Sequence, residues 1–77
     1  MDFYKKSSIT GKEYNVFKVV RILNVKQAAY YMYRGLDLLH IELSKDKYTD
    51  APVLVFYFDR NSSKNIFDEW CNQRDKQ

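Results

Sequence analysis

Apolar and polar positions alternate between Tyr14 and Leu23, and this pattern indicates the first β-strand of the chain. Most residues of the segment are β-branched or aromatic, and such side chains fit the half-buried surface of a sheet. Successive side chains of a strand point to opposite faces. One face therefore carries Val16, Val20 and Ile22, and the other carries Phe17, Val19 and Leu23.

A helix is predicted directly after this strand. Asn24 is a residue type that caps the N-terminus of a helix, and Gly35 is typical of the position just past a helix end. Between them, apolar residues recur at the i, i+3, i+4, i+7 spacing of one helical face. These residues are Val25, Ala28, Ala29 and Met32.

Two further strands follow the helix. Residues 38–43 alternate again, with Leu39, Ile41 and Leu43 on one face and Leu38, His40 and Glu42 on the other. A polar, turn-rich segment over residues 44–51 leads to the unbroken apolar run Val53–Phe58. Such a run is typical of a strand buried on both faces, so we predict that it is the central strand.

The last predicted element is a second helix, for which Asn61, Ser62 and Ser63 are the capping candidates. Its apolar side carries Ile66, Phe67, Trp70 and Cys71, and its polar side carries Asn65, Asp68, Glu69 and Asn72. Asp68 and Glu69 are expected to be solvated.

The order β-α-β-β-α predicts an α+β fold. A right-handed crossover followed by a hairpin inserts the third strand between the first two. We therefore expect an antiparallel three-stranded sheet of order 1-3-2 with two helices on one face, which is a ferredoxin-like fold minus its last strand. Residues 13–77 form this single domain. Residues 1–12 form an N-terminal arm or a short extra strand, in which Phe3 and Tyr4 pair with the segment after Thr10-Gly11-Lys12 or pack over the core.

Composition supports one packed domain, because 45% of the 77 residues are hydrophobic while only two are glycine and one is proline. The single cysteine, Cys71, cannot form an internal disulfide, which favours a reducing compartment. No apolar signal segment opens the chain, and Val53–Phe58 is too short to span a bilayer. We expect a cytoplasmic protein without membrane attachment.

The residue types needed for catalysis or metal binding are scarce. One histidine and one cysteine, His40 and Cys71, fall on different predicted elements, and no spacing matches a zinc motif. The carboxylates are dispersed, and the isolated Gly11 and Gly35 form no phosphate-binding loop. We predict no catalytic residues, no metal and no cofactor, and therefore a binding protein rather than an enzyme.

Two surfaces are candidates for binding. On the first helix, with Val25 at the centre of the buried side, Tyr30 and Tyr31 are expected on the flanks and Arg34 opposite the core. Tyr and Arg are common in interface hot spots, whereas the alternative is that the rings extend a small core. The predicted partner-binding residues are Lys26, Tyr30, Tyr31 and Arg34.

The second candidate is the sheet face away from the helices. We expect it to expose alternate residues and to contact another subunit, the N-terminal arm or a partner. The predicted contact residues are Lys18, Val20, His40, Glu42 and Tyr57. Aromatic, basic sheets of this kind also bind RNA, but the characteristic aromatic motif and the fourth strand are missing, and Glu42 would oppose phosphate.

A set of positions also resembles a known group of proteins. They are Asn24, Ala28-Ala29-Tyr30, Gly35, Leu38-Leu39, Val55-Phe56-Tyr57-Phe58 and Trp70. Over residues 16–74 the chain is similar to short, uncharacterised domains encoded by phages and mobile elements of Gram-positive bacteria. The resemblance implies a non-catalytic phage-type effector that binds and modulates a host protein, for example as an inhibitor of antiviral defence such as CRISPR or nucleotide signalling.

Other functions remain open from the sequence. The net charge of +3 is compatible with binding single-stranded nucleic acid or modulating transcription. A homodimer is also expected, and a pocket between its subunits that is lined by Tyr, Arg and Lys could hold a small ligand.

Overall fold

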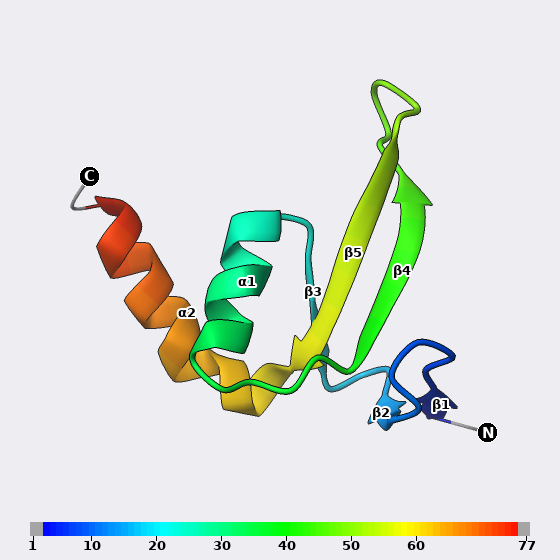
Figure 1. The fold of residues 1–77 in the computed structure, drawn as a ribbon, viewed down its shortest axis with the longest axis horizontal. Helices are drawn as coiled ribbons and strands as arrows, with labels where there is room; N and C mark the ends of the chain where they lie inside the picture. The colour runs from blue at the N-terminus through cyan, green and yellow to red at the C-terminus, as the bar shows by residue number, and fades with distance from the viewer. Residues whose placement is uncertain (1–2, 76–77) are drawn as a thin grey trace.

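The computed structural model describes residues 3–75, which form two helices and two small antiparallel sheets of two and three strands (Figure 1). The elements, in chain order, are β1 (Tyr4–Lys6), β2 (Glu13–Asn15), β3 (Val19–Ile22), α1 (Val25–Tyr33), β4 (His40–Lys45), β5 (Pro52–Asp59) and α2 (Arg60–Asp75). The α+β class predicted from the sequence is confirmed.

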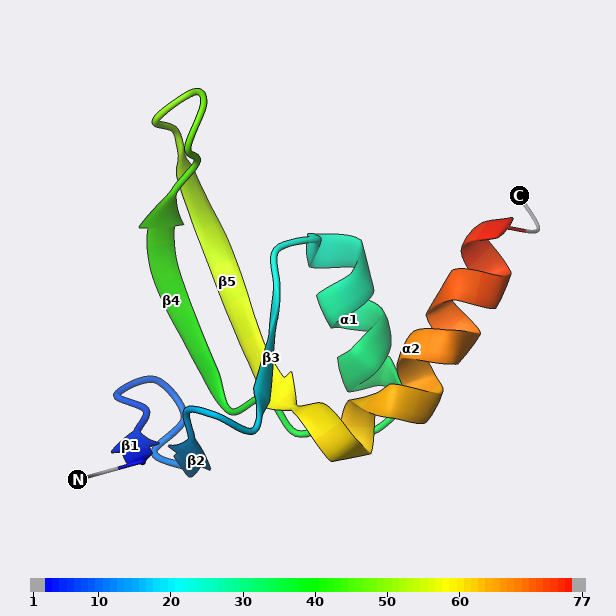
Figure 2. The ribbon, with the colours of Figure 1, turned by 180° about the vertical axis from the view of Figure 1, so that it is seen from behind.

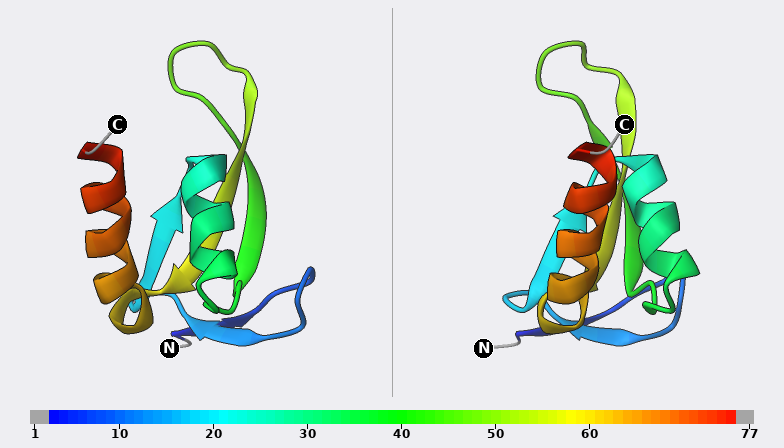
Figure 3. Two further views of the ribbon diagram at one scale, coloured as in Figure 1. Left: turned by 60° about the vertical axis from the view of Figure 1, so that its left-hand side comes forward. Right: turned by 90° about the vertical axis from the view of Figure 1, so that its left-hand side faces the viewer.

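The larger sheet has the strand order β3-β5-β4, with β5 pairing antiparallel to both neighbours. The apolar run therefore does form the central strand. The register places Val20 beside Phe58 and Ile41 beside Phe56, and all four side chains face the helices. Both helices lie on this one face of the sheet (Figures 2 and 3).

The prediction of one continuous strand over residues 14–23 is wrong. Asn15 ends β2 because its side-chain oxygen accepts the N–H of Phe17 at 2.9 Å, and its backbone oxygen accepts the N–H of Lys18 at 2.9 Å. The chain turns there, and β2 pairs with β1 in a separate hairpin, with Lys5 beside Tyr14. Of the two expectations for the N-terminal segment, strand pairing is thus the one that the structure shows. The fold has two sheets rather than one.

Helix α1 begins and ends where the sequence predicts. The Asn24 side chain accepts the N–H of Gln27 at 3.2 Å, and Gly35 takes the left-handed conformation with a φ of 95°. The predicted buried side is right for Ala28, which is buried, but wrong for Val25 and Met32, which are 60% and 40% exposed, and it missed the buried Tyr31. The helix is turned so that the large Tyr31 ring packs on Phe58.

Helix α2 follows β5 without a loop. The side chain of Asp59, the last residue of β5, accepts the N–H of Ser62 at 2.9 Å, so Asp59 is the N-terminal cap instead of Asn61, Ser62 or Ser63. Ile66 and Trp70 pack against the core as expected, whereas Phe67 is 46% exposed. Among residues 3–75, no helix is both long enough and apolar enough to cross a membrane.

Replacing Asp59 tests this assignment of the cap. Asp59→Ala leaves the N–H of Ser62 without its side-chain acceptor and should lower the free energy of unfolding by about 0.5–2 kcal/mol. Ser62→Ala removes only an exposed hydroxyl and should change stability by less than about 0.5 kcal/mol. Urea unfolding of both variants measures the difference, and a larger loss in Ser62→Ala would refute the assignment.

Candidate functional site

The face of the larger sheet that points away from the helices is the candidate site. It carries alternate residues of all three strands, namely Arg21 from β3, His40, Glu42 and Ser44 from β4, and Val53, Val55 and Tyr57 from β5. The β1–β2 hairpin covers the end of this face near His40, and the other end forms a groove.

The covered end is held by ring packing. Tyr14 of β2 is 7% exposed and stacks on the imidazole of His40, with 5.6 Å between ring centroids and 17° between ring planes. It also meets the Tyr57 ring edge-on at 5.7 Å. These three rings contact one another, so a ligand cannot stack on the faces that they cover.

Buried hydrogen bonds fix the hairpin to the same place. Ser7 is 2% exposed, and its hydroxyl oxygen accepts the N–H groups of Ile9 and Thr10, each at 3.1 Å. Its own proton is therefore free to be donated to Nδ1 of His40, 2.7 Å away, which assigns the proton of the neutral ring to Nε2. The Thr10 hydroxyl donates to the backbone oxygen of Leu39 at 2.7 Å.

A polar cluster spans the middle of the face. The Tyr57 hydroxyl donates to Glu42 at 2.7 Å, and the Arg21 guanidinium lies 3.8 Å from the same carboxylate oxygen and 5.7 Å from the Tyr57 ring centroid. Burial, followed by the hydrogen bond to Glu42, raises the pKa of Tyr57 above its ordinary value. Both charged side chains are about half exposed, so the cluster orients Arg21 more than it stabilises the fold.

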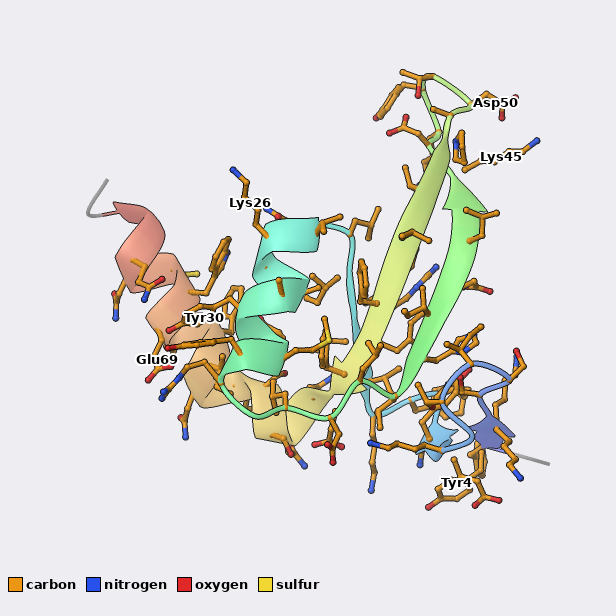
Figure 4. All side chains as sticks on the ribbon, in the orientation of Figure 1. Tyr4, Lys26, Tyr30, Lys45, Asp50 and Glu69 are labelled. Atoms are coloured by element: carbon orange, nitrogen blue, oxygen red, sulfur yellow. The ribbon has the colours of Figure 1, made fainter. Side chains whose placement is uncertain are left out.

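The groove has a volume of about 340 Å³ and lies between the end of β3 and the β4–β5 hairpin. Leu23, Val53 and Val55 give it apolar lining, and Arg21, Lys45 and Lys47 bring three cations to it. Tyr48, 95% exposed, lines it from the hairpin loop. In Figure 4 the Lys45 side chain extends away from the helices, at the end of the sheet next to the hairpin loop.

One carboxylate lines the groove, and it is used by the loop. Asp46 accepts the backbone N–H groups of Tyr48 at 2.8 Å and Thr49 at 3.1 Å, and these hydrogen bonds lower the pKa of its carboxyl. Asp50 completes the turn with a φ of 58°. Asp46 keeps its negative charge, and the groove is basic because its lining holds three cations against this one carboxylate.

The structure separates the residues predicted to form a helix surface. Tyr31 is 1% exposed and lies in the core, because its ring fills the space above Phe58. Arg34 donates two hydrogen bonds to Glu69 of α2, at 2.9 and 3.0 Å, and the Tyr30 hydroxyl lies 3.4 Å from the same carboxylate. Figure 4 shows Tyr30 and Glu69 together between the helices, while Lys26 points away from the protein.

Tyr30 and Arg34 therefore join α1 to α2, and the expectation that Glu69 is merely solvated is wrong. The paired carboxylate raises the pKa of Arg34 further above its ordinary value. Only Lys26 of the four predicted residues has no polar contact within the described part of the chain.

The predicted sheet-face residues are brought together only in part. His40, Glu42 and Tyr57 do share the open face. Val20 instead points to the helices, beside Phe58, and Lys18 lies in the bend before β3. Strand alternation alone could have placed Arg21 on the open face, together with Val19. The groove could not be predicted in this way, because Lys47 and Tyr48 lie in the β4–β5 loop and reach it only through the folded hairpin.

Among the described residues, no three His, Cys, Asp or Glu side chains lie close enough together to hold a metal ion. Searches with family models, curated proteins and solved structures found no match to this chain.

Replacing Ser7 tests the docking of the hairpin. Ser7→Ala removes the acceptor of two N–H groups and the donor to His40, so the free energy of unfolding should fall by about 1–3 kcal/mol. Ser8→Ala, an exposed neighbour, is the matched control. Urea unfolding measures stability, and amide exchange of β1 and β2 shows whether the loss is local. Equal effects of the two substitutions would contradict this account.

The buried phenol of Tyr31 predicts a loss of stability in alkali. Burial raises the pKa of Tyr31 above its ordinary value near 10, although a hydrogen bond from Gln27 partly opposes the shift. The unfolded chain ionises at a lower pH than the folded chain, so the neutral Tyr31 phenol contributes to the free energy of unfolding. This contribution is complete below pH about 10 and is lost as the pH rises through the raised pKa. Between pH 8 and 11, the free energy of unfolding should depend less steeply on pH in Tyr31→Phe than in Tyr33→Phe, which replaces an exposed tyrosine and is the control.

Proposed function

We propose that this chain is a non-catalytic binding protein that holds an acidic, partly apolar segment of a host protein in the groove of the open sheet face and thereby modulates that protein. The observation that carries the proposal is the combination of apolar lining with three cations, Arg21, Lys45 and Lys47. Burial of apolar ligand side chains against Leu23, Val53 and Val55 would contribute binding free energy, and carboxylates of the ligand would pair with the cations.

The position of the groove supports a protein ligand over a single-stranded nucleic acid. Nucleic-acid-binding sheets present free aromatic faces on which bases stack. Here Tyr14 covers part of His40 and Tyr57, and Arg21 lies near the Tyr57 ring. Tyr48 is the one aromatic residue in the groove lining.

The polar groups of this face support a binding role, because they contact one another. His40 Nδ1 is occupied by Ser7, and Glu42 is occupied by Tyr57 and Arg21. These side chains act as structural and orienting groups in the proposal, so the chain would act on its target by occupying a segment of it.

Selection from a displayed peptide library tests the proposal. The wild-type protein should enrich peptides that combine Asp or Glu with apolar residues. A synthetic peptide from the enriched set should bind Lys45→Glu/Lys47→Glu at least about 10-fold more weakly, because two favourable charge contacts become repulsive. Fluorescence anisotropy gives the dissociation constants.

A charge-matched variant provides the control. Lys5→Glu/Lys6→Glu makes the same change in net charge on the exposed hairpin strand β1 and should bind the peptide like wild type. Selection of no acidic peptides, or equal weakening by both double variants, would refute the groove as the site. Tighter binding of an oligo-dT strand than of any peptide, with a steep dependence on salt, would favour nucleic acid instead.

A further inference from the structure

Strand β4 is an edge of the larger sheet, and its outer side has no strand partner within residues 3–75. The outer side is open along most of its length, with the turn of the β1–β2 hairpin near its lower end (Figure 3). An edge strand presents unpaired N–H and C=O groups, and soluble proteins usually block such an edge.

The free part of this edge is short and symmetrical. The N–H of Asp46 donates to Ala51 at 2.9 Å in the register of the β4–β5 pair, so even-numbered residues of β4 direct their backbone groups to β5. The odd-numbered residues Ile41, Leu43 and Lys45 therefore direct theirs outward. Thr10 occupies the outward oxygen of Leu39, and the hairpin loop begins after Lys45, so Leu43 is the centre of the free edge.

The side chain of Leu43 gives this edge an apolar centre. Leu43 is 69% exposed, and its cross-strand neighbour Leu54 is 44% exposed. Each lies two residues along its strand from a core residue, Leu43 from Ile41 and Leu54 from Phe56, so both point to the helix side of the sheet. They lie beyond the part of that side that α1 and α2 cover. An uncovered pair of leucines beside unpaired backbone groups is an association surface.

We infer that a second copy of this chain pairs with β4 edge to edge, antiparallel, on a two-fold axis through Leu43. Ile41 then lies opposite Lys45 of the other copy, and Leu43 lies opposite its own counterpart, so all three outward-directed residues form ladder pairs. The two sheets become one of six strands. The Leu43 and Leu54 side chains of both copies cover one another on the helix side.

The charges of β4 select this register. With the axis through Leu43, Glu42 lies opposite Ser44 and His40 opposite Asp46, so no like charges face each other. An axis through Glu42 would oppose two copies of that carboxylate, and an axis through Ser44 would oppose Glu42 and Asp46. Leu43, at the centre of the pairing, lies on the face of the sheet opposite the groove, whereas Lys45 belongs both to the paired edge and to the groove lining.

Sedimentation equilibrium over a range of concentrations tests the association. The wild-type protein should approach the mass of two chains, and Leu43→Lys should weaken the dimer by about 100-fold, because two apolar contacts are replaced by two facing cations. Tyr33→Lys, at an 84% exposed position on α1, is the control and should dimerise like wild type. A single-chain mass at every concentration, or equal effects of both substitutions, would overturn the inference.

A disulfide experiment tests the register itself. In a Cys71→Ser background, Leu43→Cys should oxidise to a covalent dimer, because the paired Cα atoms lie about 5.5 Å apart, within the range of a disulfide. Lys45→Cys is the matched control, since its two copies would lie about 14 Å apart along the strands. Circular dichroism shows that the variants are folded. Faster cross-linking of Lys45→Cys than of Leu43→Cys would overturn the proposed axis.

Discussion

The Tyr31 ring packs edge-to-face on Phe58, with 5.2 Å between the ring centroids, and joins α1 to the central strand β5. Both side chains are almost fully buried, and burial of a side chain of this size contributes about 1.5–3 kcal/mol. The contact sets the rotation of α1, which in turn directs Arg34 and Tyr30 toward Glu69 of α2. In a chain of 77 residues, this one packing choice thus decides which side chains are available at the surface.

Local patterns were enough to predict most of the larger sheet and both helices. The Asn24 and Gly35 signals marked α1 correctly, and the apolar run over Val53–Phe58 identified the central strand. The break near Asn15 was missed, because a continuous β-favouring sequence hides a turn that depends on one side-chain oxygen. The cap of α2 was missed because Asp59 also belongs to the preceding strand.

The candidate site was less predictable than the fold. Helical spacing with Val25 at its centre placed Tyr31 at the surface, but the larger aromatic ring fills the core and leaves Val25 exposed. Arg34 and Glu69 are 35 residues apart, and no local pattern reveals such a pair. Alternation did place His40, Glu42 and Tyr57 on one face, whereas the groove required the hairpin to bring Lys45, Lys47 and Tyr48 beside Leu23.

The direct junction of β5 and α2 gives the two connections of β5 unequal freedom to change in length. Asp59 is paired with Val19 in the sheet and at the same time caps the helix. One residue inserted after Asp59 would rotate the rest of α2 by about 100° and turn Ile66 and Trp70 away from the core. The loop after Lys45 has no such coupling to the helices, so sequence length can vary there, at the mouth of the groove, while the scaffold stays the same.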